Sequence, residues 1–178
     1  MTNKTLIVGT GVSMAALSLA GGLMAGSFVP PNTWFVMVAL QPAIEETARY
    51  MSARKFVWEA DLKTAACIGG LIGLLEIGSK ALMSQMIFKL DFATLLSLIG
   101  FSPSLPIHIA LSVAFYSFRR WRPAKTFGMH ALLNLTLLAF AVSLWGSMSI
   151  PAYAATMVVF SVALCFTLTV VVRRIAST

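Results

Sequence analysis

Two adjacent glutamates and an arginine lie within an otherwise apolar stretch, residues 34–53. On a helix, Arg49 is four residues after Glu45 and three after Glu46, so it can pair with either carboxylate. The two glutamates point about 100° apart, so Arg49 can hold one while the other faces a cavity. Different surroundings can separate the pKa values of two such groups and prepare one as a general base. A Glu–Arg pair that only neutralises itself between helices remains an alternative, although it leaves the second glutamate unexplained.

Four more polar residues of catalytic types, Glu76, His108, His130 and Asn134, lie in apolar stretches further along the chain. His130 and Asn134 are spaced i,i+4 and share a helix face, where an imidazole can transfer protons and an amide can donate to an oxyanion. An ionised group at bilayer depth costs at least about 2.5–3.5 kcal/mol, so these groups should face one another or a wet cavity. Packing roles stay open: a Glu76–Lys80 pair, and hydrogen bonds between helices for the other three.

The composition indicates what kind of scaffold must position these residues. Of the 178 residues, 58% are hydrophobic and 11% charged, against roughly 25% charged in soluble domains, and the mean hydropathy is +0.87. This excludes a soluble or disordered chain. We expect an all-α polytopic membrane protein, a single transmembrane domain over residues 1–178, with about six helices. Cys67 and Cys165 lie in apolar runs and are expected to be small buried residues.

Six apolar stretches mark the expected spans: residues 6–29, 34–53, 62–88, 93–118, 125–145 and 150–172. Pro103 and Pro106 interrupt the fourth stretch, which predicts a broken span, with a break at 100–106 and His108 in the first turn of the helix that follows. Gly69 and Gly73 form a G-x-x-x-G face for a close helix contact, and the second span is the expected partner.

Charge in the loops predicts the orientation. The net charge of +7 comes from basic residues that fall on one side of a six-span chain, which fits the positive-inside rule better than nucleic-acid binding. They are Lys4, Arg54, Lys55, Lys63, Arg119, Arg120, Arg122, Lys125, Arg173 and Arg174. Lys89 and Asp91 fall on the opposite side. We expect both termini in the cytoplasm, with the chain in a bacterial-type plasma membrane.

Taken together, the polar residues resemble a known motif series. The run Glu45-Glu46-Thr47-Ala48-Arg49-Tyr50, then Glu76, His108 and the pattern His130-x-x-x-Asn134 are similar to the motifs of a superfamily of intramembrane peptidases. It comprises CAAX prenyl proteases, bacteriocin-processing enzymes, and PrsW-like and YhfC-like members. The resemblance covers about residues 41–135. The arginine spacing is closest to the YhfC-like branch, because in CAAX proteases the arginine falls one residue later.

This resemblance implies a glutamate-dependent intramembrane endopeptidase acting on a membrane-embedded peptide or protein. Glu45 or Glu46 would activate water with help from His108, and His130 and Asn134 would stabilise the oxyanion. Arg49 would support the glutamates, and Glu76 would be the acid of the second motif. Because the superfamily also has inactive members, a scaffold or immunity-type membrane protein is an alternative.

One other function and one alternative for a cofactor stay open. The broken fourth span would also suit a small proton-coupled carrier, since interrupted helices line transport sites. The sequence has no His-Glu-x-x-His pattern, so we expect no metal or other cofactor. A divalent cation bound by the glutamates and histidines is the alternative.

Overall fold

The computed structural model describes residues 3–26, 35–88, 103–118, 122–144, 147 and 149–177. All regular structure in these ranges is helical, which confirms the all-α class with six α-helices and one π-helical turn. The elements are α1 (Asn3–Gly26), η1 (Val36–Leu40), α2 (Gln41–Lys55), α3 (Leu62–Phe88), α5 (Ser104–Ser117), α6 (Arg122–Leu144) and α7 (Ile150–Ser177).

The helix bounds agree closely with the apolar stretches. The third stretch coincides with α3, whereas α6 begins three residues earlier than expected and α7 continues five residues beyond 172. Several expectations lie outside the described residues: the end of the first span, the part of the fourth span before Pro103, and the loop residues Lys89, Asp91, Arg119 and Arg120.

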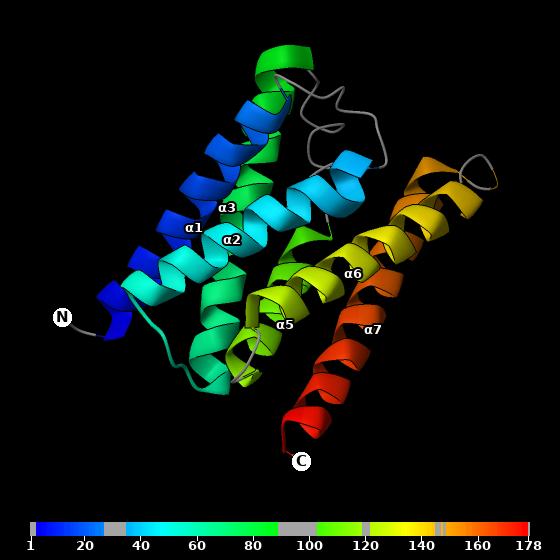
Figure 1. Cartoon of the computed structure of the whole chain (residues 1–178). Coiled ribbons are helices and arrows are strands. Elements are labelled where there is room, and N and C mark those ends of the chain that lie inside the picture. The colour runs from blue at the N-terminus through cyan, green and yellow to red at the C-terminus, as the bar shows by residue number, and fades with distance from the viewer. Residues whose placement is uncertain are drawn as a thin grey trace.

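The helices form a bundle with α5 in its interior (Figure 1). α1 packs on α2 and α3, α3 packs on α5, and α5 also contacts α6 and α7. Ten of the fourteen residues of α5 are buried. One apolar cluster fills the space between α5 and helices α1, α2 and α3, around Ile68 and Phe115. A second fills the space between α5, α6 and α7, around Leu111 and Leu133.

Glycines bring α3 and α5 into backbone contact. A Cβ on Gly69 would lie 2.3 Å from the carbonyl oxygen of His108, and one on Gly73 would lie 2.7 Å from the Cα of Leu105. The G-x-x-x-G face therefore packs against α5, and the expectation that it packs against the second span is wrong. Because α3 packs against α5, Glu76, one turn after Gly73, is placed beside His108.

The start of α5 also differs from expectation. The helix begins at Ser104, so His108 opens its second turn and not its first. Pro106 occupies the third helical position, where the missing N–H costs no hydrogen bond because the first four N–H groups of a helix have no partner within it.

Proline shapes the start of α2 in another way. Pro42 is the second residue of α2 and lies two residues after the end of the π-helical turn Val36–Leu40. The proline ring has no N–H and clashes with the carbonyl four residues earlier, here Val38. The wider π turn before Gln41 accommodates that carbonyl, and α2 then continues regularly to Lys55.

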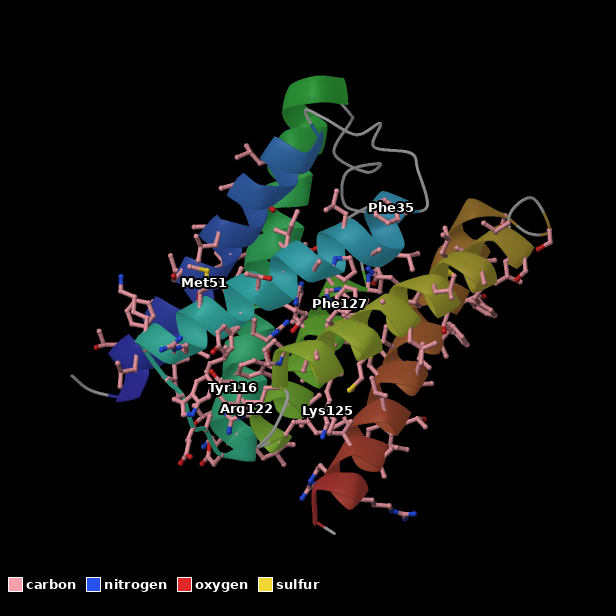
Figure 2. The ribbon with its side chains drawn as sticks, viewed as in Figure 1. Phe35, Met51, Tyr116, Arg122, Lys125 and Phe127 are labelled. Carbon is pink, nitrogen blue, oxygen red and sulfur yellow. The ribbon has the colours of Figure 1, made fainter. Side chains whose placement is uncertain are left out.

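The connection between α2 and α3 is held at one end of the bundle. Both chain ends and this connection lie at that end in Figure 1, and Figure 2 shows Tyr116, Arg122 and Lys125 there as well. Arg122 donates to the carbonyl of Trp58 at 2.6 Å and lies over the Trp58 ring at 4.7 Å. The Tyr116 hydroxyl donates to the carbonyl of Val57 at 3.0 Å.

Asp61 caps the start of α3 in the same connection. Its Oδ1 accepts the backbone N–H of Thr64 at 2.7 Å, as N-cap aspartates do. Hydrogen bonds from the Thr64 side chain and backbone hold the pKa of Asp61 below its usual value.

Three described helices are long and apolar enough to cross a membrane. The windows are Leu62–Ser79 in α3, Arg122–Leu144 in α6 and Ala155–Arg174 in α7. α1 and α5 contribute shorter apolar stretches, Lys4–Leu17 and Ser104–Ser117. α2 is 15 residues long and contains five charged residues, among them the two adjacent glutamates and Arg49.

Large apolar side chains cover the outside of these helices. Val142 on α6 is 67% exposed and Phe166 on α7 is 70% exposed. Of the two cysteines, Cys165 is buried as expected, whereas Cys67 is exposed on α3, so the expectation for Cys67 is wrong. Cys67 lies two residues before Gly69 and is turned away from the α5 contact.

Candidate active site

Glu46 lies in the interior and is bound at both of its oxygens. The residue is 1% exposed. Its Oε2 accepts from Nε of Arg49 at 3.0 Å, and its Oε1 lies 3.0 Å from Nδ1 of His130. An ionised carboxylate only accepts hydrogen bonds, so Nδ1 of His130 is the donor. Glu46 therefore anchors Arg49 and the His130 ring, and it is not among the residues that line the nearby cavity.

Glu45 faces that cavity. Its Oε1 accepts a hydrogen bond from the side-chain amide of Gln41 at 2.8 Å. Its Oε2 lies 3.8 Å from Nε2 of His108 and 3.7 Å from Nε2 of His130. The two adjacent glutamates thus have different surroundings. Arg49 pairs with Glu46, while Glu45 points toward the cavity and two imidazoles.

Arg49 connects α2 to α5. The residue is 2% exposed, and each of its three nitrogens has a different partner. Nε donates to Glu46, Nη1 donates to the hydroxyl of Ser112, and Nη2 lies 3.3 Å from Nδ1 of His108. With this set of partners, the guanidinium fixes both the charge of Glu46 and the orientation of the His108 ring.

The contacts of His108 determine its tautomer. A guanidinium can only donate, so Nδ1 of His108 accepts from Arg49 and the ring hydrogen lies on Nε2. Nε2 is in hydrogen-bond contact with Oε2 of Glu76 and also faces Glu45. His130 carries its hydrogen on Nδ1 toward Glu46, so in a neutral His130 the other nitrogen, Nε2, is an acceptor. The two imidazoles, with ring centroids 6.2 Å apart, therefore present a donor and an acceptor to the same carboxylate.

The cavity has a volume of about 260 Å³ and is polar at one end. Its polar lining consists of Gln41, Glu45, Glu76, Ser104, His108, His130 and Asn134. Along α6 the lining changes from His130 and Asn134 to Leu137, Leu138 and Ala141, and Met157 of α7 completes the apolar wall. The space holds several waters at about 30 Å³ each, or one water and an apolar side chain.

All seven residues expected from the sequence meet in this region. Glu45, Glu76, His108, His130 and Asn134 line the cavity, and Glu46 and Arg49 lie directly behind it. Sequence reasoning missed Gln41 and Ser112. A usable signal existed for both, because Gln41 is one helical turn before Glu45 and Ser112 is one turn after His108.

Comparisons with known proteins add no relative. No protein-family model, curated protein or solved structure matches this chain. The resemblance to intramembrane peptidases therefore stays a prediction from the motif residues.

Carboxylate and imidazole side chains are also possible ligands of a metal ion. Among the described residues, no group of three or more His, Cys, Asp or Glu side chains is arranged to hold a metal ion. The arrangement is suited to moving protons between a carboxylate, two imidazoles and a water.

Proposed function

We propose that the chain is an integral membrane protein of about six spans, with a broken fourth span and both termini in the cytoplasm of a bacterial-type plasma membrane. Three long apolar helices and their exposed apolar side chains support membrane insertion. The basic residues near both termini and in the α2–α3 connection support the orientation, since these parts lie at one end of the bundle (Figure 1).

We further propose that it is a glutamate-dependent intramembrane endopeptidase of the kind its motifs resemble. One observation carries this proposal: Oε2 of Glu45 lies within 4 Å of Nε2 of both His108 and His130, at the wall of an interior cavity. A carboxylate used only for packing has no need of two imidazoles and a space large enough for water.

The proposed reaction begins with a water bound between Glu45 and His130. Glu45 takes one proton from the water, and the oxygen forms a bond to the carbonyl carbon of the peptide. The carbonyl electron pair moves to its oxygen, which accepts a hydrogen bond from the amide of Asn134. A second hydrogen bond comes from Nε2–H of His108 when the substrate oxygen replaces Glu76 as its acceptor. The C–N bond then breaks as Glu45 passes its proton to the nitrogen, giving a carboxylic acid and an amine.

This scheme assigns the two histidines different roles from those the motif resemblance implies. There, His108 assists the base and His130 holds the oxyanion. The tautomers favour the reverse, because Nε2 of His108 carries a hydrogen, held by Glu76 at the cavity wall, and Nε2 of a neutral His130 has a lone pair. Glu46 then holds the His130 ring in place, as the buried acid does for the histidine of a serine-protease triad.

The apolar end of the cavity indicates the substrate. Leu137, Leu138, Ala141 and Met157 form a wall that favours an apolar side chain next to the scissile bond. This apolar wall supports a membrane-embedded peptide or protein segment as the proposed substrate class.

Cleavage of membrane-spanning peptides tests this function. The purified protein would be reconstituted in liposomes with a panel of synthetic peptides that differ at one apolar position, in water enriched in oxygen-18. We expect new carboxyl termini that carry the heavy oxygen, and about 100-fold or more loss of rate in Glu45→Gln. Glu59→Gln is the matched control, because Glu59 is exposed in the α2–α3 connection. Cleavage at full rate in Glu45→Gln would contradict the proposal.

A further inference from the structure

Gln41 is the one polar group that contacts Glu45 from within the same helix among the described contacts. It is the first residue of α2, directly after the π-helical turn, and its side chain lines the cavity. Its amide nitrogen donates to Oε1 of Glu45 at 2.8 Å. Neither the chemistry of the motif nor the scheme above assigns this residue a role.

The hydrogen bond distinguishes the two oxygens of Glu45. Oε1 is occupied by Gln41, whereas Oε2 is the atom that faces His108 and His130. A carboxylate that rotates freely would present either oxygen to a bound water. With one oxygen held by a donor on its own helix, the other is directed into the cavity.

We propose that Gln41 is a positioning residue that selects Oε2 of Glu45 as the proton-accepting atom, an inference that rests on the proposed peptidase function. Glu45 is faced by Gln41 from α2, Glu76 from α3, His108 from α5 and His130 from α6. Of these, Gln41 alone does not titrate. It therefore orients the carboxylate at every pH without adding a charge that would hold the proton away.

The local backbone explains why a glutamine can do this. Gln41 and Glu45 both lie in α2, and residues four apart in a helix share a face. π turns inside helices occur frequently at functional sites. Here the π turn ends directly before Gln41.

A chemical probe tests the contact without any peptidase activity. Dicyclohexylcarbodiimide is an apolar reagent that modifies protonated carboxyl groups, and the adduct on Glu45 can be measured by mass spectrometry of the reconstituted full-length protein. Loss of the amide donor uncovers Oε1 of Glu45, so Gln41→Ala should raise its modification at neutral pH several-fold. Gln41→Met, which keeps the chain length, should do the same if the alanine variant folds poorly.

Thr47→Ala is the matched control for this measurement. Thr47 lies on α2, is exposed, and its hydroxyl donates to the carbonyl of Ala43 in its own helix. We expect wild-type modification of Glu45 in this variant. Equal modification of Glu45 in wild type, Gln41→Ala and Gln41→Met would overturn the proposal.

Peptide cleavage supplies a second readout that a purely structural role would not change in the same way. Gln41→Ala should lower kcat about ten-fold and leave KM unchanged. Gln41→Glu should regain activity only at acid pH, where the introduced carboxyl group is protonated and can donate to Glu45. Identical pH profiles for Gln41→Glu and wild type would contradict a positioning role. A changed carbodiimide reaction in a protein that cleaves no peptide would instead contradict the peptidase function and leave the Gln41 contact supported.

Discussion

Oε2 of Glu45 lies 3.8 Å from Nε2 of His108, and the backbone that carries His108 rests directly on Gly69. The position of His108 relative to Glu76 on α3 is therefore set by how closely α3 and α5 approach, and His108 in turn faces Glu45 of α2. This relationship joins the chemistry of the site to the packing of the bundle, and it makes both open to mutation.

Gly69→Ala should displace His108 by forcing α5 away from α3. The new Cβ would lie 2.3 Å from the carbonyl oxygen of His108, so α5 must move away from α3. We expect a loss of about 1–3 kcal/mol in stability, typical of overpacking, together with lower peptide cleavage. Gly70→Ala is the matched control, since a Cβ there meets nothing within 4 Å. Thermal unfolding in detergent measures the effect, and equal stability of the two variants would show that the contact is not tight.

The adjacent glutamates should respond differently to the same substitution. Glu45→Gln removes the candidate base at a cavity wall, so activity should fall while stability changes little. Glu46→Gln leaves the buried Arg49 without its anionic partner, which typically costs about 3–5 kcal/mol. Thermal unfolding of the two variants side by side checks this, and a larger loss of stability in Glu45→Gln would reverse the assignment of their roles.

Ala141→Phe should change substrate preference. The added ring would fill the apolar end of the cavity, so peptides with a large side chain next to the scissile bond should be cleaved about ten-fold more slowly than peptides with a small one. Ala139→Phe serves as control because Ala139 is exposed on the same helix. The ratio of kcat/KM for two peptides measures the change, and an unchanged ratio in Ala141→Phe would place the substrate elsewhere.

Asp61 should make stability depend on pH. Its pKa is lowered in the folded protein by hydrogen bonds from Thr64, so the stabilisation is present above the unfolded pKa of about 3.9 and is lost as the pH falls through the lower folded pKa. The difference in melting temperature between wild type and Asp61→Ala should be largest near neutral pH and shrink in acid. A difference that is constant from neutral to acid pH would exclude the carboxylate as its source.

The orientation is tested by reporter fusions. A fluorescent protein fused after Thr178 should fold in the cytoplasm and fluoresce, and alkaline phosphatase fused at the same position should be inactive, because that enzyme needs an oxidising compartment. Active phosphatase at this position would mean that the positive-inside argument fails.

Much of this architecture is accessible from the sequence because helices follow local rules. The limits of α3 are clear from the sequence, since a largely apolar run without proline is flanked by charged residues on both sides. The meeting of Glu45, His108 and His130 also follows, because charged and polar groups in an apolar bundle must satisfy one another.

Contacts between helices are harder to predict. The G-x-x-x-G face shows that some helix approaches α3 closely, but its spacing contains no information about which one, and α5 is the partner. Likewise the sequence offers Arg49 two carboxylates at helical spacing. The choice of Glu46 depends on the position of Ser112 and His108 across the interface. The tautomers of the histidines follow only from these tertiary partners.

The glycine contact between α3 and α5 has one more consequence. Where side chains separate two helices, a change in temperature or in lipid thickness can be absorbed by rotamer changes, and the helices shift relative to each other. At Gly69 and Gly73 the main chains themselves are in contact, so there are no side chains between them whose rotamers could change. The separation of Glu76 on α3 and His108 on α5 should therefore stay constant across membranes of different fluidity, even while the outer faces of α6 and α7 adapt.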